Sequence, residues 1–195
     1  YAFFAEHHIQ DKVLFPGMGY LWLVWQAIAS SRQCELSKLP ITFYDVQFLQ
    51  PVIFTANKRV TTLTVQYLHG SRNLDVHEGD TKVAIGRAAV SSDPLGLKVL
   101  SDDAEYVLNA ADVYKELRLR GYQYGSEFSG IRQASLDGNH AQIAWTGNWV
   151  TYLDTILQVS LLGLGRGMRI PKSITKMMID PTVPLSSLCS VQVNR

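Results

Sequence analysis

Residues 16–31, PGMGYLWLVWQAIASS, decide how this chain folds. After the turn at Pro16 and Gly17, residues 18–31 are apolar nearly all round, a pattern typical of a helix enclosed by other structure. The most apolar run, residues 20–29, is only about half the length that a membrane span needs. The sequence therefore predicts a long buried helix over residues 18–31, and we expect no membrane partner.

Composition narrows the class of protein. The 195 residues are 47% hydrophobic and 18% charged, as in an ordinary globular protein with a sizeable core. A net charge of +1 gives no global electrostatic footprint for nucleic acid, so we expect no nucleic-acid partner. Cys34 and Cys189 are too few for a disulfide framework or a cysteine metal cluster, which favours a cytoplasmic setting. Because the chain begins at Tyr1 without a methionine, we expect a domain cut from a longer protein.

Strand-like runs follow the first helix. They alternate apolar and polar residues between turn residues, which predicts an antiparallel meander, at residues 41–48, 51–54, 59–68, 74–78 and 82–90. The stretch SSDPLG, residues 91–96, reads as a linker.

The second part of the chain repeats this order in outline. A short amphipathic helix at 112–119 precedes a glycine-rich turn, and a second apolar helix covers 149–164; strands are expected near 131–137, 140–146, 173–180 and 188–193. Two sheets that each wrap one helix would bury both helices. We therefore predict an α+β fold with an N-terminal half, residues 1–95, and a C-terminal half, residues 96–195.

Two adjacent histidines, His7 and His8, precede the first helix in the stretch EHHIQDKVLFPGMGYL, residues 6–21. Histidine ordinarily titrates near neutrality, which points to proton transfer or metal binding. Neighbouring side chains in an extended segment point to opposite faces, so at most one of the two faces a given pocket, and chelation by both is disfavoured. A surface histidine, or a hydrogen-bonded core histidine, is the alternative.

Asp154 stands in the middle of the second apolar helix, among leucines and isoleucine. Burying a carboxyl group is costly, so it must have a partner, be protonated or face a solvent-filled pocket. Gln158 follows four residues later on the same helix face and could orient it. The alternative is a structural hydrogen bond between helix and sheet. A histidine and a buried carboxyl group, one from each half, could also form an acid–base pair.

Three motifs in order resemble the 3-hydroxyacyl-carrier-protein dehydratase domains of animal fatty acid synthases and related polyketide synthases. HHIQDKVLFPGMGYLWLVW is similar to the motif H-x-x-x-G-x-x-x-x-P, and counting back nine from Pro16 selects His7. VYKELRLRGYQYGSEFSGI resembles the Y-G-P-x-F-Q-G segment, with Tyr124 and Gly125 as its first residues. NWVTYLDTILQVSLLG resembles the D-x-x-x-Q/H helix, with Asp154 and Gln158.

The resemblance implies a double hot-dog fold, in which each of two fused halves wraps a long helix in a curved antiparallel sheet. It implies a hydro-lyase that removes water from a 3-hydroxyacyl thioester, giving the trans-2-enoyl product. His7 would be the base and Asp154 the acid, oriented by Gln158. Pro16, Gly17, Tyr124 and Gly125 would line the substrate site, with a backbone N–H near Gly17 holding the thioester carbonyl.

The same resemblance implies the partners. The substrate would be carried on the phosphopantetheine of an acyl carrier protein, without a metal or a further cofactor. Other domains of a megasynthase would surround the chain, and the parent synthase would form a homodimer.

Three positions depart from the motifs. Asp11 stands at the motif glycine, Ser126 at the proline after Tyr124 and Gly125, and Ser129 at the glutamine. Glycine tolerates positive φ more readily than aspartate, so the loop that carries His7 is where a displacement is expected. A non-catalytic acyl-binding or scaffolding domain is one alternative function. A cyclising product-template domain, which shares the fold and a His/Asp pair, is the other.

Overall fold

The computed structural model describes residues 2–55, 60–91, 105–165 and 167–193. The chain forms two compact units, each built from separate stretches. Unit 1 comprises Tyr1–Met18, Lys98–Arg169 and Leu185–Arg195, and unit 2 comprises Gly19–Leu97 and Ile170–Pro184. Apart from Ser91, the predicted linker at 91–96 lies outside the described residues, as does the boundary between residues 95 and 96. The division into two halves therefore stays a prediction.

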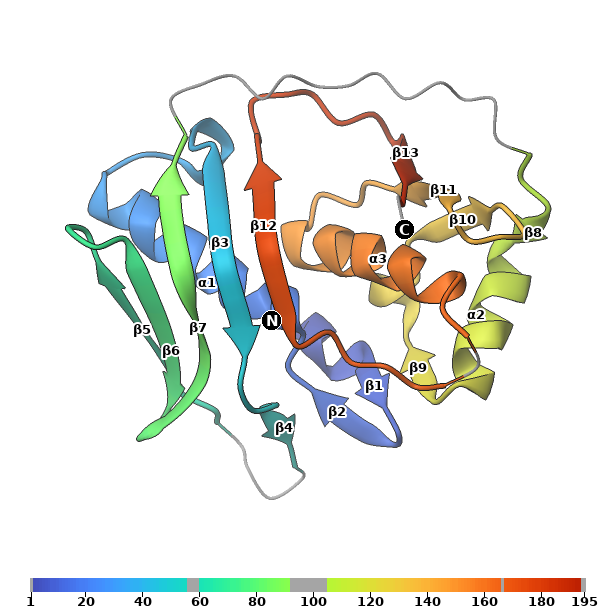
Figure 1. Cartoon of the computed structure of the whole chain (residues 1–195), viewed down its shortest axis with the longest axis horizontal. Helices are drawn as coiled ribbons and strands as arrows, with labels where there is room; N and C mark the ends of the chain where they lie inside the picture. Colours follow the sequence, from blue (N-terminus) through green and yellow to red (C-terminus); the bar gives the residue numbers. More distant parts are fainter. Residues whose placement is uncertain (1, 56–59, 92–104, 166, 194–195) are drawn as a thin grey trace. The chain divides into compact units, whose positions relative to one another are not determined.

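Unit 2 is a five-stranded sheet with one long helix. The strand order is β12-β3-β7-β6-β5, and the neighbouring strands pair antiparallel. The strands are β3 (Ile41–Phe48), β5 (Leu63–Leu68), β6 (Asn73–Glu78), β7 (Thr81–Val90) and β12 (Ser173–Ile179). Two short elements lie between the longer ones: η2 (Leu36–Lys38) precedes β3, and β4 (Ile53–Phe54) lies between β3 and β5 in the sequence. Helix α1 (Gly17–Ser31), all but its first two residues in unit 2, runs across one face of this sheet (Figure 1).

Helix α1 is buried as its sequence predicts. Leu21, Val24 and Trp25 are at most 1% exposed. Its polar atoms have partners, because the Trp25 Nε1–H donates to the Leu39 carbonyl at 2.9 Å and the Tyr20 hydroxyl accepts from the Val52 N–H at 3.2 Å. A buried polar group that lacks a partner would cost on the order of 1–3 kcal/mol. These bonds therefore let two aromatic side chains with polar atoms sit in an apolar core.

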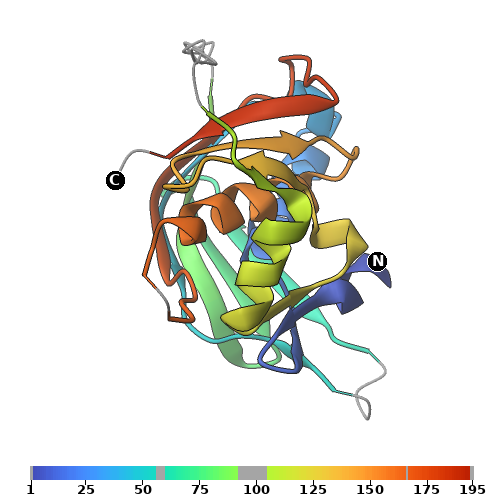
Figure 2. The same cartoon turned by 90° about the vertical axis from the view of Figure 1, so that its right-hand side faces the viewer.

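Unit 1 contains two groups of strands and two helices. Strand β1 (His7–Ile9) pairs antiparallel with β2 (Lys12–Leu14) and with β9 (Tyr122–Tyr124). A second sheet has the order β13-β11-β10-β8, from Leu188–Gln192, His140–Ala144, Ile131–Ala134 and Leu108–Asn109. Helices α2 (Ala110–Leu119) and α3 (Trp149–Leu162) complete it, with 3-10 turns η1 (Ala2–Glu6) and η3 (Ser126–Phe128). Figure 2 views this unit with α2 in front.

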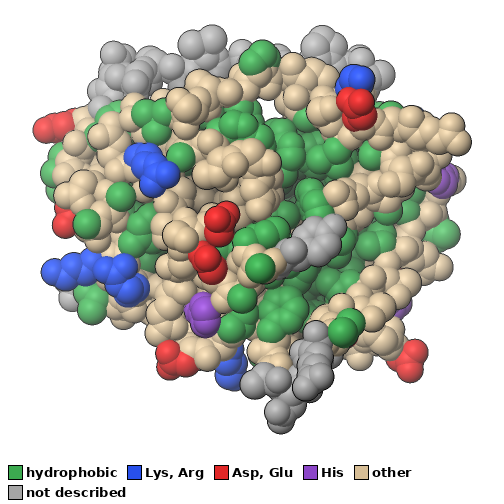
Figure 3. Space-filling model, turned by 180° about the vertical axis from the view of Figure 1, so that it is seen from behind, with side chains coloured by type: hydrophobic (Ala, Val, Ile, Leu, Met, Phe, Trp, Pro, Cys, Tyr) green, Lys and Arg blue, Asp and Glu red, His purple; other side chains and the backbone are tan. Residues whose placement is uncertain are grey.

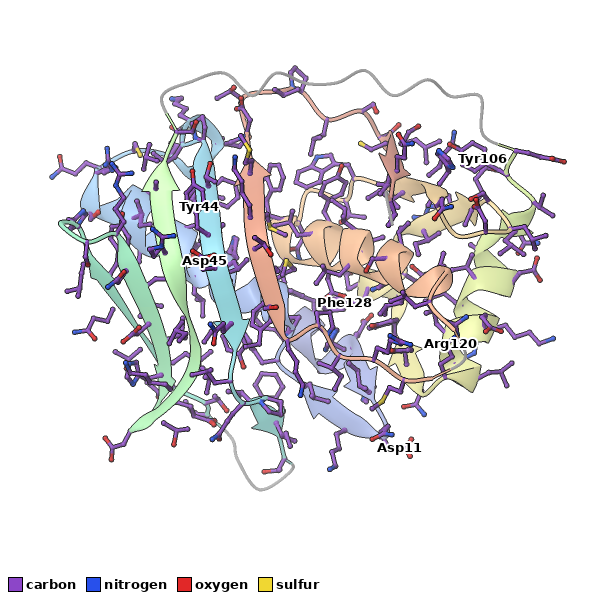
Figure 4. All side chains as sticks on the ribbon, in the orientation of Figure 1. Asp11, Tyr44, Asp45, Tyr106, Arg120 and Phe128 are labelled. Carbon is purple, nitrogen blue, oxygen red and sulfur yellow. The ribbon has the colours of Figure 1, made fainter. Side chains whose placement is uncertain are left out.

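Both ends of α3 have polar partners. The Asn148 side chain accepts from the N–H groups of Val150 and Thr151 at the first turn. At the last turn, the Arg120 guanidinium donates to the carbonyls of Leu161 and Leu164 at 2.8 Å each (Figure 4). Helix ends leave N–H and C=O groups unpaired, and these side chains pair several of them. The helix that carries Asp154 is thus fixed at both ends.

Most predicted elements are confirmed. The predicted helices at 18–31, 112–119 and 149–164 correspond to α1, α2 and α3, and the predicted strand at 41–48 is β3. The strand predicted at 59–68 begins only at Leu63. Strands β1, β2, β8 and β9 were not predicted, because two or three residues are too few to show alternation. Of the described residues, none belongs to a helix long and apolar enough to cross a membrane.

Candidate active site

Strand β1 separates the two histidines. His7 and Ile9 are buried and His8 is half-buried, as alternation along a strand requires. His7 pairs in register with Tyr124 of β9, and His8 pairs with Gln123. Only His7 therefore faces the interior of unit 1, in agreement with the expectation that at most one histidine faces a pocket.

A backbone carbonyl sets the tautomer of His7. Its Nδ1 lies 2.9 Å from the carbonyl oxygen of Leu14. A carbonyl can only accept, so Nδ1 carries the hydrogen and, in the neutral ring, Nε2 holds a free lone pair. Two aromatic rings lie close to the imidazole, with centroids 5.4 Å away for Tyr124 and 5.0 Å away for Phe128. The unprotonated nitrogen is thus held in one direction.

The Nε2 atom of His7 faces Asp154. Its side chain comes from α3, and its Oδ1 is 3.6 Å from His7 Nε2. Each of the two residues is only 5% exposed. Gln158, one turn further along α3, donates from Nε2 to Asp154 Oδ2 at 3.0 Å and to the Phe128 carbonyl, also at 3.0 Å. The structure brings the three predicted catalytic residues together within unit 1.

Burial raises the pKa of the Asp154 carboxyl group, opposed by the nearby His7 ring and by the hydrogen bond from Gln158. Desolvation disfavours the charged form of a carboxyl group. Since Oδ2 already accepts from Gln158, Oδ1 is the oxygen left to carry a proton. A protonated Asp154 therefore presents its O–H on the side of His7 Nε2, and the pair combines a lone pair with an acidic proton.

Tyr124 and Gly125 lie beside this pair. Burial raises the pKa of Tyr124 well above its ordinary value, and the charge of Asp154 adds to the effect. The tyrosine is therefore a neutral hydroxyl at physiological pH. A Cβ on Gly125 would come within 2.5 Å of Glu6 Oε2, so only glycine lets β9 run this close to the turn before His7.

Pro16 and Gly17 lie where β2 gives way to α1. Pro16 is buried, and Gly17 is the first residue of the helix. Leu14, which holds His7 Nδ1, lies three residues before Gly17, so the histidine is tied to the segment that begins α1. First-turn N–H groups have no partner inside their own helix and can bind an anionic oxygen. The role of these two residues in binding substrate stays a prediction.

Asp11, which stands where the motif has glycine, has a hydrogen-bond partner close by. Asp11 and Gln10 form the two-residue loop of the β1–β2 hairpin, with φ of 58° and 49° (Figure 4). Both central residues of a tight hairpin turn need positive φ, which explains a motif glycine at this position. The Asp11 N–H donates to Gln123 Oε1 at 3.2 Å, and Gln123 Nε2 donates to Asp11 Oδ1 at 2.9 Å. The pair of bonds holds the loop against β9.

The two serine departures also have partners. The Ser126 hydroxyl donates to Glu6 Oε2 at 3.2 Å, and the Glu127 N–H donates to the same oxygen at 2.8 Å. The Ser129 hydroxyl donates to the Gly125 carbonyl at 2.8 Å. Turn η3 is thereby fixed on Glu6, the residue before His7, without the proline of the motif.

Tyr114 belongs to the same network and was not predicted. Its hydroxyl lies 3.1 Å from Gln158 Oε1, to which it donates, and accepts from the Ile131 N–H at 2.9 Å. The sequence places Tyr114 beside Val113 and Leu117 on the apolar face of α2, where a tyrosine reads as core. Only the fold shows that its hydroxyl reaches α3.

Charged side chains are dispersed on the face of the molecule that Figure 3 draws. On the face drawn in Figure 3, basic side chains lie at separate places and do not form one continuous patch. Within the part of the chain that the structure describes, no three His, Cys, Asp or Glu side chains are grouped so that they could hold a metal ion.

Comparisons by sequence point to one family. Residues 1–79 match the family described as "Polyketide synthase dehydratase domain". "Probable polyketide synthase 38" of Dictyostelium discoideum is 23% identical over 71% of this chain. The chain spans 5% of the length of that relative.

Comparisons by structure agree over nearly the whole chain. The "Dehydratase domain from CurF module of Curacin polyketide synthase" has a TM-score of 0.76 and 16% identity, covering 100% of this chain and 78% of its own. The dehydratase domain of RzxB from Pseudomonas fluorescens has a TM-score of 0.74 and 16% identity, covering 95% and 76%. The dehydratase domain of the CurK module has a TM-score of 0.72 and 20% identity, covering 99% and 77%.

These likenesses confirm the predicted α+β, double hot-dog fold class. They also bear out the resemblance to dehydratase domains, and the domains that match come from polyketide synthases. Residues 1–79 match the polyketide synthase dehydratase family by sequence, and the chain as a whole has the fold of polyketide synthase dehydratase domains.

Proposed function

We propose that the chain is an active hydro-lyase that removes water from a 3-hydroxyacyl thioester to give the trans-2-enoyl thioester. The single observation that carries the proposal is the facing of His7 Nε2 and Asp154 Oδ1 at 3.6 Å, both buried. Leu14 fixes one end of this pair and Gln158 the other. A structural histidine would not need its free nitrogen aimed at Asp154 Oδ1, which accepts no hydrogen bond from any other residue that the structure describes.

The reaction needs a base and an acid at the same time. His7 Nε2 takes the proton from the α-carbon, and the electron pair of that C–H bond becomes the α,β double bond. The bond from the β-carbon to its hydroxyl oxygen breaks, and the proton of Asp154 Oδ1 joins the departing oxygen, so that water leaves. His7 is then protonated and Asp154 ionised. Transfer of one proton from Nε2 to Oδ1, across the short gap between them, restores both groups.

The thioester carbonyl needs a donor while negative charge builds up next to the α-carbon. The N–H of Gly17, the first residue of α1 and part of unit 1, is the donor that we propose. Tyr124 and Gly125 would form the wall beside the β-carbon, because β9 pairs directly with β1 at His7.

Related structures support these assignments. Two crystal structures of the CurK dehydratase are described as inactive mutants, one with a histidine replaced by phenylalanine and the other with an aspartate replaced by asparagine. The dehydratase domain of PpsC from Mycobacterium tuberculosis is described in complex with C12:1-CoA, an acyl thioester. By analogy, a histidine and an aspartate would carry the chemistry here, on a thioester substrate.

The partners of the site follow from the family. A domain of a polyketide synthase works beside the other domains of its synthase. We propose that the substrate arrives on the phosphopantetheine of an acyl carrier protein, in the cytoplasm, within a dimeric parent synthase and without a further cofactor. A scaffolding role is less well supported, since Asp11, Ser126 and Ser129 all have hydrogen-bond partners that hold the His7 region in place.

Turnover of a 3-hydroxyacyl thioester by purified variants tests the proposal. We expect His7→Ala to abolish the formation of enoyl product and Asp154→Asn to lower kcat at least about 100-fold, because one removes the base and the other the acid. The matched control is His8→Ala, which changes the neighbouring side chain on the other face of β1. It should keep most of the activity.

Circular dichroism of each variant shows whether the fold is kept. If His8→Ala were inactive and His7→Ala active, the assignment of His7 as the motif histidine would be wrong. A folded wild-type chain that turned over no hydroxyacyl thioester would favour the scaffolding alternative.

A further inference from the structure

We propose that Tyr114 is a positioning residue for the dehydration: its hydroxyl holds the Gln158 amide in the rotation that directs Nε2 at Asp154. The inference rests on the proposed function, because it concerns how the acid of that reaction is oriented. Tyr114 touches neither His7 nor the place of the reacting atoms. It acts through a chain of hydrogen bonds from α2 to α3.

The directions of these bonds follow from the groups that cannot reverse roles. The Ile131 backbone N–H can only donate, so the Tyr114 oxygen accepts from it at 2.9 Å. The Tyr114 hydroxyl then has one hydrogen to donate and two acceptors near it, Gln158 Oε1 at 3.1 Å and the Phe128 carbonyl at 3.4 Å, of which Gln158 Oε1 is the nearer. The Phe128 carbonyl can only accept as well, so the Gln158 nitrogen faces it and, with its second hydrogen, Asp154 Oδ2. The amide has one orientation that satisfies every partner.

This orientation decides which oxygen of Asp154 is free. With Nε2 on Oδ2, the proton of the acid resides on Oδ1, next to His7 Nε2. If the amide rotated by half a turn, its oxygen would face Oδ2, and a protonated Asp154 would donate to Gln158 instead of to the substrate. Tyr114 opposes that rotation, because its hydroxyl would lose its nearer acceptor and keep only the Phe128 carbonyl at 3.4 Å, while that carbonyl would lose the bond from Gln158. This series of hydrogen bonds therefore keeps the proton of Asp154 on Oδ1, from which it can reach the substrate.

The surroundings of Tyr114 fit a fixed donor. The side chain is buried, and burial raises the pKa of its hydroxyl, so the group stays protonated. The groups that interact with Asp154 are His7 from β1, Tyr124 from β9, Gln158 on α3 itself and Tyr114 of α2, whose pKa the charge of Asp154 raises and that of Arg132 on β10 lowers. Of these groups, Gln158 donates a hydrogen bond to the carboxylate and Tyr114 determines where that donor points.

Replacing Tyr114 by phenylalanine removes the hydroxyl and keeps the ring. Without its donor on Oε1, the Gln158 amide loses one of the bonds that fix it, and the bond to Oδ2 weakens. That bond favours the ionised carboxylate, so its loss raises the pKa of Asp154. We expect Tyr114→Phe to lower kcat by about 10- to 100-fold, as loss of alignment in an active site does. The basic limb of the kcat/KM profile should move to higher pH.

Tyr122→Phe is the matched control. It also removes a buried hydroxyl that bonds a backbone segment, here the Arg169 carbonyl and N–H, but has no link to Gln158. Both variants lose a buried bond to the backbone, so both should lower the Tm measured by thermal unfolding. Only Tyr114→Phe should change the pH profile. Equal shifts in the two variants, or none in Tyr114→Phe, would overturn the proposal.

A double-mutant cycle separates action through Gln158 from a general loss of packing. In a Gln158→Ala background, Tyr114→Phe should lower kcat no further, because the amide through which it acts is gone. Full additivity of the two changes would contradict the proposal.

Titration of the Asp154 carboxyl group by carbon NMR gives a readout that needs no turnover. The apparent pKa should rise in Tyr114→Phe and stay unchanged in Tyr122→Phe. If the chain proved inactive on every thioester, the proposed function would fail. This titration would still show whether Tyr114 controls Asp154, and an unchanged Asp154 titration in Tyr114→Phe would refute the inference alone.

Discussion

At the scale of single residues, burying the carboxyl group of Asp154 costs stability but gives the site an acid. Asp154 is 5% exposed on a helix packed with apolar side chains, and burial raises its pKa. The sequence predicted this conflict, since a carboxyl group among leucines is rarely there for packing alone. It also predicted Gln158 as the orienting partner. It could not predict that the Leu14 carbonyl would set the tautomer of His7, because a backbone acceptor leaves no trace in residue type.

The raised pKa of Asp154 leads to a prediction on the stability of the fold. A group whose pKa is raised by folding binds its proton more tightly in the folded state, so the free energy of unfolding falls as pH rises through the folded pKa. Asparagine at 154 keeps the shape and cannot ionise. We expect Asp154→Asn to raise the Tm at pH 8 by about 2–4 °C, the response of a chain of this size to about 1 kcal/mol.

The gain should be smaller at pH 5, where the wild-type carboxyl group is more often protonated. Calorimetry at both pH values checks this, with Asp80→Asn, an exposed aspartate in the β6–β7 turn, as the control for a simple change of charge. A gain that grew as pH fell would contradict the assigned direction of the pKa.

At the scale of elements, helix α3 must keep a fixed position for Asp154 to meet His7. Arg120, directly after α2, donates to two carbonyls in the last turn of α3 and to that of Leu164 just beyond it, and its side chain is 10% exposed. Gly130 lets the middle of α3 come close, because a Cβ there would lie 2.6 Å from Thr155 Oγ1. The sequence predicted the end of α2 and the start of α3 from their apolar patterns, whereas α2 begins two residues earlier and α3 ends two residues earlier than predicted. It did not show that an arginine of one helix would cap the other, since that depends on their packing.

Removing the cap should destabilise the chain. Arg120→Ala leaves carbonyls of Leu161, Leu162 and Leu164 without their charged donor in a poorly hydrated place, and we expect a loss of about 2–4 kcal/mol in the free energy of unfolding. Arg118→Ala, an exposed change in the same last turn of α2, should alter it by less than about 0.5 kcal/mol. Urea unfolding measures both variants. A loss in Arg120→Ala no larger than that in Arg118→Ala would show that the cap is dispensable.

At the scale of the whole molecule, each compact unit takes a short stretch from the far end of the chain. Strand β12 completes the sheet of unit 2 by pairing with β3, and strand β1 brings His7 to β9 in unit 1. The repeated order of helix and strands was enough to predict two helix-and-sheet assemblies. It was not enough to predict this exchange, because pairing partners far apart in sequence are not encoded in the pattern of either strand.

Because β12 belongs to unit 2 and β1 to unit 1, we can predict how the chain behaves when it is cut into two fragments. A cut between residues 95 and 96 interrupts no described helix or strand, since β7 ends at Val90 and β8 begins at Leu108. Residues 1–95 alone would nevertheless lack β12, leaving the edge of β3 unpaired, and residues 96–195 alone would lack β1 and His7. We expect neither fragment to unfold cooperatively by itself, whereas the two expressed together should recover cooperative unfolding and dehydration.

The control for this experiment is a C-terminal fragment without residues 173–179. It should fail to complement residues 1–95, because the strand that pairs with β3 is gone. Cooperative unfolding of residues 1–95 alone would show that unit 2 does not need β12. The pairing of β3 with β12 would then be a consequence of folding in the intact chain, and residues 1–95 would be an independent folding unit.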